Sequence, residues 1–192
     1  MDKPTFVFSL GAWLTPIVFD AVRDRLNTLG YPSECPAHPS IGAEPPSLTL
    51  EDDVASLRRD KDQSLLGMLG GNYLPWMKVE LTKKKGDYAR ADGTGAVGWQ
   101  DLTVEQQEKW NRTTMHTSRA VFSGETTYEP WRDIPCSYII CEQDLALPPA
   151  IQEFFASKMG GPDTTHRLPS SHSPFLSMPD RLVGVLEEIV KV

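Results

Sequence analysis

The sequence predicts a single α/β domain built on a mostly parallel sheet. Short apolar segments typical of buried strands alternate with segments whose apolar residues recur at helical spacing. That alternation favours parallel strands joined by crossover helices. The length, 192 residues, suits one domain, and a chain of this size buries enough surface to fold without a metal or a disulfide.

Start and stop signals place the individual elements along the chain. Pro16 suits the first turn of a helix and Gly30 its C-terminal cap, while Thr103 followed by Gln106 is a candidate capping box. The expected elements, in order, are a strand at 5–10, a helix at 15–29, a strand at 31–35, a helix at 47–59, a helix at 103–122, a strand at 135–141, a helix at 149–159, a strand at 164–168 and a helix at 179–192.

Residues 61–101 show no sustained period. Glycine pairs and Pro75-Trp76 interrupt the stretch, but it also contains several large apolar residues. Because so long a segment is unusual as an unstructured loop, we expect a lid-like insert at about 61–122 within a single domain covering 1–192.

Composition excludes several classes of function. The net charge of -7 and the pI of about 5.1 argue against a nucleic-acid binder, which needs a basic face. Cys35, Cys136 and Cys141 have no paired spacing and predict free thiols in a reducing compartment. We see no signal peptide, no membrane-spanning stretch and no zinc-ligand spacing. We therefore expect a cytoplasmic protein without membrane association, metal or other cofactor.

The segment 137–177 carries the strongest chemical signal. Asp144 follows the strand-like run that ends at Cys141, and His172 lies in a loop after the next predicted strand. Ligand sites of parallel sheets lie beyond the carboxyl ends of the strands, so these two side chains are candidates for an acid–histidine pair. Asp144 has an equally open alternative, which is to cap the helix that begins near Pro148.

The first predicted strand ends in a similar position at Gly11-Ala12-Trp13. Backbone N–H groups of this turn are candidate donors to an oxyanion, and one such donor contributes about 3 kcal/mol where it operates. All three candidate groups follow strand ends, which indicates one common site.

At these residues the chain resembles the α/β-hydrolase fold superfamily, and within it small esterase-like proteins of microbial secondary metabolism. Four segments carry the resemblance, in the order that the family has them: FVFSLGAW (6–13), TLEDDVASLR (49–58), YEPWRDIPCSYIICEQDLALP (128–148) and SSHSPFLSMPDRL (170–182). The segment 65–80 is similar to the family's lid. The resemblance implies an acid at Asp144, a histidine at His172 and an oxyanion turn at Gly11–Trp13.

The family's nucleophile is missing from this pattern. The resemblance implies a serine in a strand–turn–helix elbow, G-x-S-x-G or H-S-Y-G-G, soon after the helix at 49–58. Here that helix leads directly into the lid-like segment, and no such motif occurs anywhere in the chain. A strand–helix–strand unit of roughly 30 residues or more is therefore absent.

The absent strands would be central ones in the family's sheet. We therefore expect a reduced α/β-hydrolase-like fold with about four strands, helices on both faces, and the strand near Thr5 paired with the strand near Pro135. An unpaired strand edge exposes backbone donors and acceptors, so the alternative to this pairing is homodimerisation across the open edge.

These observations favour an enzyme that acts on a small carbonyl-containing metabolite, such as a polyketide-like intermediate. His172 would be a general base, assisted by Asp144 and by the donors at Gly11, Ala12 and Trp13. Three alternatives stay open. The chain could be a conventional ester or lactone hydrolase with a displaced serine (Ser9, Ser64 or Ser123), a non-catalytic binding or assembly protein, or a truncated gene product.

Overall fold

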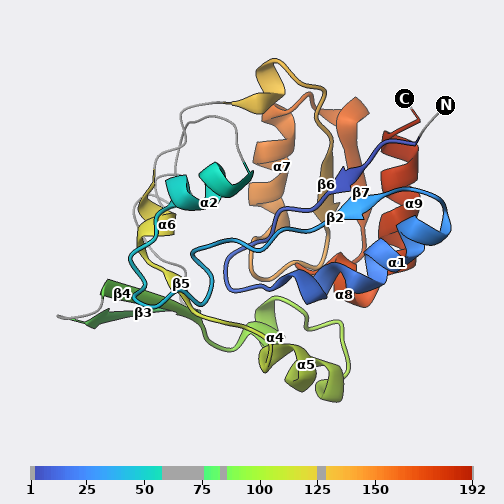
Figure 1. The fold of residues 1–192 in the computed structure, drawn as a ribbon. Helices are drawn as coiled ribbons and strands as arrows, with labels where there is room; N and C mark the ends of the chain where they lie inside the picture. Colours follow the sequence, from blue (N-terminus) through green and yellow to red (C-terminus); the bar gives the residue numbers. More distant parts are fainter. Residues whose placement is uncertain (1–2, 58–75, 83–85, 125–128, 192) are drawn as a thin grey trace.

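The computed structural model describes residues 3–57, 76–82, 86–124 and 129–191. It contains two parallel strand pairs with their helices, and a region of antiparallel strands and two short helices that we call the cap (residues 76–82 and 86–118) (Figure 1). The elements are β1 Phe6–Val7, η1 Pro16–Phe19, α1 Asp20–Thr28, β2 Ser33–Glu34, α2 Leu50–Leu57, β3 Met77–Thr82, β4 Gly86–Ala91, α4 Thr94–Val97, α5 Val104–Asn111, β5 Thr117–Ser118, α6 Ala120–Ser123, η2 Pro130–Arg132, β6 Tyr138–Cys141, α7 Pro149–Lys158, η3 Pro162–Thr164, β7 Thr165–Leu168, α8 Pro174–Ser177 and α9 Pro179–Ile189.

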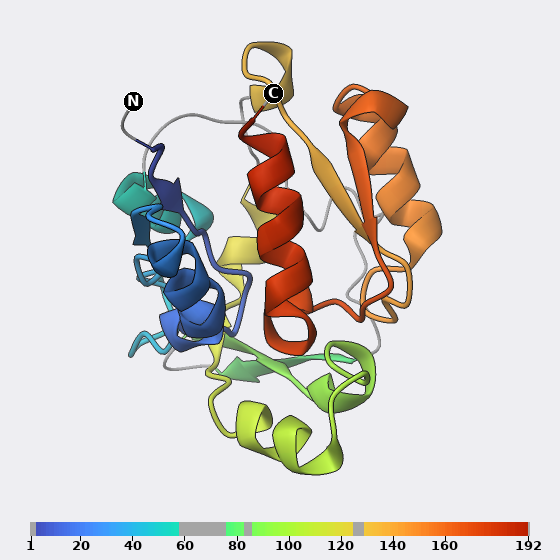
Figure 2. The same ribbon diagram turned by 90° about the vertical axis from the view of Figure 1, so that its right-hand side faces the viewer.

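Strands β1 and β2 form one parallel pair, and β6 and β7 form the other. Both pairs run toward the cap, so the loops after β1, β6 and β7 face it (Figures 1 and 2). This parallel α/β arrangement agrees with the expected fold class.

The expected pairing between the strand near Thr5 and the strand near Pro135 is wrong. In the part of the chain that the structure describes, β1 bonds only to β2, and β6 only to β7. Helix α9 stands in front of the interval between the two pairs (Figure 2). The pairs are joined through side chains instead of a hydrogen-bonded ladder. Homodimerisation across the open edge stays a prediction.

The core that joins the pairs lies among α1, β7 and α9. Its buried members are Val22, Leu26, Tyr31, Leu168, Leu182 and Val183. Burial of such a side chain contributes about 1.5–3 kcal/mol, which makes this cluster the main apolar link between the N-terminal and C-terminal pairs. An ion pair between Arg25 of α1 and Asp180 of α9 lies at its edge, and its hydrogen bond lowers the pKa of Asp180.

The cap contains two strands that the sequence analysis did not predict. Residues 77–82 and 86–91 form an antiparallel pair, β3–β4, inside the stretch without a sustained period. Met77, Val79 and Leu81 alternate with polar residues, which is a strand signal of period two. Residues 61–75 and 83–85 of the expected lid-like insert lie outside the described residues.

The helix expected at 103–122 ends at Asn111 instead. It begins as predicted, with a capping box between Thr103 and Gln106. At its end the hydroxyls of Thr113 and Thr114 donate to the carbonyls of Trp110 and Asn111, which satisfies acceptors that a longer helix would use.

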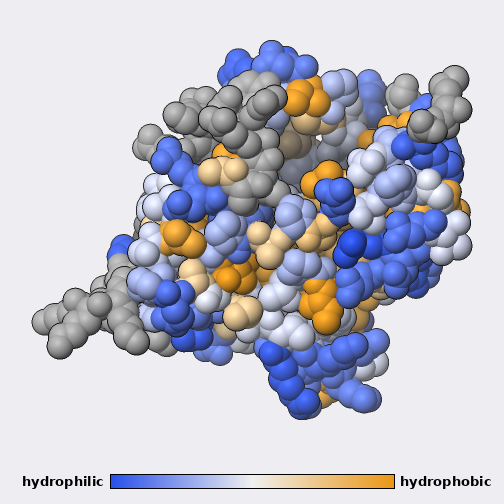
Figure 3. Space-filling model, in the orientation of Figure 1, coloured by the Kyte–Doolittle hydropathy of each residue, from blue (hydrophilic) through white to orange (hydrophobic). Residues whose placement is uncertain are grey.

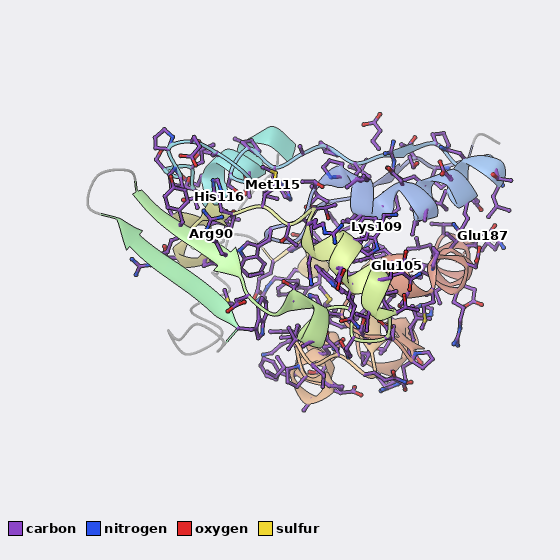
Figure 4. All side chains as sticks on the ribbon, turned by 90° about the horizontal axis from the view of Figure 1, so that it is seen from below. Arg90, Glu105, Lys109, Met115, His116 and Glu187 are labelled. Carbon is purple, nitrogen blue, oxygen red and sulfur yellow. The ribbon has the colours of Figure 1, made fainter. Side chains whose placement is uncertain are left out.

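The outer face of α5 is hydrophilic and forms the lower lobe of the molecule (Figure 3). A shallow groove on this face is lined by Thr103, Glu105, Gln106, Glu108, Lys109 and Arg112. Figure 4 shows Glu105 and Lys109 on this helix, and Arg90, Met115 and His116 gathered beside the β3–β4 strands. The α5 groove contains none of the candidate site residues.

Candidate active site

The loops after β6 and β7 lie side by side because the strand pairing continues beyond the strands. The backbone N–H of Gln143 donates to the carbonyl of Ser170 at 2.9 Å. This contact brings the acid loop to the histidine loop, and Nδ1 of His172 lies 2.7 Å from Oδ2 of Asp144. The two sequence-predicted side chains, 28 positions apart, therefore form a direct hydrogen bond.

The carboxylate of Asp144 is buried, with only 2% of its side chain exposed. Its Oδ1 accepts the N–H groups of Ala146 and Leu147, both at 2.8 Å, and its Oδ2 accepts from the amide of Gln152 at 3.0 Å. With the imidazole, four donors surround a group that only accepts when ionised. Burial of this polar side chain is therefore compensated by hydrogen bonds.

The helix-capping alternative for Asp144 does not hold. Pro148 occupies the N-cap position of α7, and no side chain makes a capping hydrogen bond there. Asp144 bonds to the turn that precedes the helix, so it shapes the acid loop and holds the imidazole at the same time.

Of the two ring nitrogens of His172, Nδ1 is hydrogen-bonded to Asp144 and Nε2 is not. An ionised Asp144 only accepts, so Nδ1 of His172 carries the proton and Nε2 carries the lone pair. Nε2 makes no hydrogen bond within the described part of the chain, and 48% of the side chain is exposed. The geometry thus presents a basic nitrogen that can accept a proton.

The cap holds both of these loops. The backbone N–H of Ser171, next to His172, donates to Oδ2 of Asp101 at 2.9 Å, and the hydroxyl of Ser171 donates to the carbonyl of Gly98 at 3.1 Å. The amide of Gln100 donates to the carbonyl of Gln143 in the acid loop. Residues 98–101 therefore place the cap directly over the acid–histidine pair.

The turn at Gly11–Trp13 lies under the same cap. The indole N–H of Trp13 donates to the carbonyl of Ala89 at 3.0 Å, and the N–H of Met115 donates to the carbonyl of Trp13 at 3.0 Å. Trp13 is 8% exposed and stacks on Phe122. The aromatic ring is thus part of the packing that fixes the turn.

The backbone of this turn is unusual at Trp13 rather than at Gly11. Trp13 has a φ of 69°, in the left-handed region that disfavours residues with a large side chain. The N–H groups of Ala12 and Trp13 donate to no acceptor among the residues that the structure describes. They are therefore available as donors to a bound oxygen.

None of the displaced serines contacts His172 in the described residues. Ser123 donates to the carbonyl of Ala120, and Ser64 lies outside the described ranges. Ser9 lies 3.2 Å from Nε2 of His38, but this nitrogen also lies 2.9 Å from the carbonyl of Leu10. A carbonyl only accepts, so Nε2 of His38 is protonated and cannot remove the proton of Ser9.

Two of the three thiols, those of Cys35 and Cys141, are poor nucleophiles in this structure. Burial raises the pKa of Cys141. Burial also raises the pKa of Cys35. Because the thiolate is the reactive form, neither group is activated. Across the described ranges, no group of three or more His, Cys, Asp or Glu residues could hold a metal ion, and no helix could cross a membrane.

Sequence reasoning missed three residues that shape this site. Gln152 bonds to Asp144, Asp101 bonds to the N–H of Ser171, and His38 bonds to the carbonyl of Leu10. The helical spacing of Gln152 could have indicated its burial, because it lies four residues before Ala156 on the same face of α7. Asp101 and His38 had none, since their contacts join distant parts of the chain.

Two curated fungal proteins align with nearly the whole chain. Alpha/beta hydrolase nvfD of Aspergillus novofumigatus is 22% identical over 241 residues, covering 97% of this chain and 96% of that protein. Probable hydrolase R7 of a Phoma species is 25% identical over 241 residues, covering 98% and 99%. Both alignments are longer than the 192-residue chain, so they include positions of the relatives that have no counterpart here.

Solved structures of similar fold also align with nearly the whole chain. A variant of polyneuridine aldehyde esterase matches with a TM-score of 0.76 and 14% identity, covering 97% of this chain and 98% of its own. Tomato methylketone synthase I, in a complex with beta-ketoheptanoate, matches with a TM-score of 0.74 and 10% identity, covering 100% and 98%. At 14% and 10% sequence identity, this similarity shows a shared fold alone.

The family profile described as the alpha/beta hydrolase family matches residues 8–185. This range includes the turn at Gly11–Trp13, Asp144 and His172. The chain belongs to the alpha/beta hydrolase family.

Proposed function

We propose that this protein catalyses proton transfer on a small carbonyl compound, with His172 as the general base. The observation that carries the proposal is the 2.7 Å bond from Nδ1 of His172 to Asp144, which leaves Nε2 with a free lone pair. No hydroxyl or thiol in the described ranges accompanies this nitrogen, so the pair has the parts of a base without those of a nucleophilic triad.

The step that fits these parts is removal of a proton from the carbon next to a carbonyl. The C–H bond breaks, its proton moves to Nε2 of His172, and its electron pair delocalises onto the carbonyl oxygen as an enolate. The N–H groups of Ala12 and Trp13 are the donors for that oxygen, and each contributes about 3 kcal/mol where such a donor operates. Return of the proton completes an exchange or an isomerisation.

A β-keto compound is the substrate class we favour. Its C2 carbon lies between two carbonyl groups, which makes the proton acidic enough for a base alone. General base catalysis contributes about 10²–10⁴-fold, much less than a full triad, so a reactive substrate is needed. Methylketone synthase I, a structural neighbour in complex with beta-ketoheptanoate, makes this compound a reasonable probe.

The test is deuterium uptake at C2 of beta-ketoheptanoate in D₂O, followed by NMR. We expect the protein to accelerate uptake over buffer, and His172→Ala to lose about 10²–10⁴-fold. Asp144→Asn should lose a similar factor, because its amide donates and so favours the opposite tautomer of His172. Exchange no faster than in buffer, or an unimpaired His172→Ala protein, would overturn the proposal.

Ester hydrolysis is the competing outcome. A fluorophosphonate that labels a serine, together with turnover of p-nitrophenyl butyrate, would establish a nucleophile and exclude a base-only mechanism. We expect neither, because Ser9 and Ser123 bond elsewhere.

A further inference from the structure

Gln152 is a buried amide whose hydrogen bonds all converge on the acid loop. It lies on α7, and 2% of its surface is exposed. Its Oε1 accepts the N–H of Cys141 at 2.9 Å, and its Nε2 lies near three acceptors: the carbonyl of Leu147 at 2.7 Å, Oδ2 of Asp144 at 3.0 Å and the carbonyl of Cys141 at 3.2 Å.

These contacts fix the orientation of the amide. An N–H group can bond only to an acceptor, so the atom facing Cys141 N must be the oxygen. The nitrogen then faces the carboxylate and the two carbonyls, each of which only accepts. Gln152 thus joins the end of β6, the acid and the start of α7.

The bond to Asp144 reaches the same oxygen that holds His172. Oδ2 accepts from Nε2 of Gln152 at 3.0 Å and from Nδ1 of His172 at 2.7 Å, while Oδ1 is occupied by backbone N–H groups. A second donor on Oδ2 holds the plane of the carboxylate and the position from which it faces the imidazole.

We propose that Gln152 is a positioning residue, which holds Oδ2 of Asp144 so that His172 keeps its proton on Nδ1 and its lone pair on Nε2. The inference rests on the proposed function for its catalytic meaning. A glutamate at this position would place an anion against two carbonyls and a carboxylate, and an asparagine would be one methylene too short to reach them.

The test reads the tautomer of His172 by long-range ¹H–¹⁵N NMR at pH 8. We expect a single Nδ1–H tautomer in the native protein and a mixture of tautomers in Gln152→Asn and Gln152→Met. Glu153→Gln changes the neighbouring residue of α7, which is exposed and pairs with Arg167, and should leave the tautomer unchanged.

Activity provides the second readout. Gln152 does not touch the substrate, so kcat for C2 exchange of beta-ketoheptanoate should fall about tenfold in Gln152→Asn while KM stays the same. A shifted tautomer without any native exchange activity would support the positioning role and refute the proposed function. Folded variants that keep the native tautomer would overturn the positioning role, as would loss of folding in both variants, because Gln152 would then support the fold as a whole.

Discussion

The two strand pairs contribute to the site in different ways. The C-terminal pair, β6–β7, delivers two side chains that bond to each other within one stretch of chain. The N-terminal pair, β1–β2, delivers backbone N–H groups whose turn is held from outside, by Ala89 and Met115 of the cap. The acid–histidine bond therefore joins two neighbouring loops of one strand pair, which residues 98–101 of the cap also contact, whereas the donor turn is held by contacts far along the chain.

This difference shows which contacts the acid and histidine loops depend on. The acid and histidine loops are held by β6–β7 pairing, by Gln152 and by residues 98–101 of the cap. None of these contacts involves a strand between the two pairs. In the proposed function, His172 is the base and the turn at Gly11–Trp13 supplies the donors, a combination suited to proton transfer rather than acyl transfer.

Replacement of Trp13 should have the largest effect and should separate the two regions. Trp13→Ala removes a buried indole, its stack on Phe122 and its bond to Ala89. We expect a loss of about 4 kcal/mol in the free energy of unfolding, measured with urea. Hydrogen exchange should increase around Met115 and β4 but not in β6–β7.

Leu168→Ala is the matched control from the other region. Leu168 is 1% exposed and belongs to the α1–β7–α9 core, so its loss should cost about 3 kcal/mol and expose β6–β7 to exchange. If both variants increase hydrogen exchange at the same amides, the two regions unfold as one cooperative unit and do not differ as described.

The sequence predicted the local features well and the long-range ones poorly. Outside the cap, the predicted order of strands and helices agrees with the structure, and so do the capping box at Thr103 and the hydrogen bond between Asp144 and His172, because these features depend on short signals or on the general rule for parallel strands. Inside the cap, the strands β3 and β4 were not predicted, and the helix expected at 103–122 ends at Asn111. The pairing of β1 with β6 was wrong, because side-chain packing around Leu168, rather than strand propensity, decides how the pairs meet.

Tyr138, at the start of β6, should make the C-terminal region sensitive to alkali. Burial raises its pKa from 10 to about 12, and Cys141 and Asp144 add to the effect. Between these values the unfolded chain loses the phenol proton while the folded chain keeps it, so stability falls as pH rises. Because the ring is only half-buried, we expect a loss of about 1–2 kcal/mol between pH 10 and 12.

Urea unfolding of the native protein and of Tyr138→Phe at pH 10 and pH 12 measures this loss. Phenylalanine has no titrating group, so the variant should lose less stability over the interval. Equal losses in both proteins would mean that Tyr138 does not cause the alkaline sensitivity of this region.

Gly11→Ala should have the smallest effect and sharpens the account of the N-terminal turn. Gly11 does not have a positive φ, and an added Cβ would meet only the Cδ1 of Leu14, at an ordinary 3.9 Å. We expect the free energy of unfolding to change by less than about 0.5 kcal/mol, measured by thermal denaturation. The strained conformation belongs to Trp13, which the cap holds in place. A loss of more than about 1 kcal/mol would instead mean that the turn depends on glycine, and that the cap alone does not fix the donors.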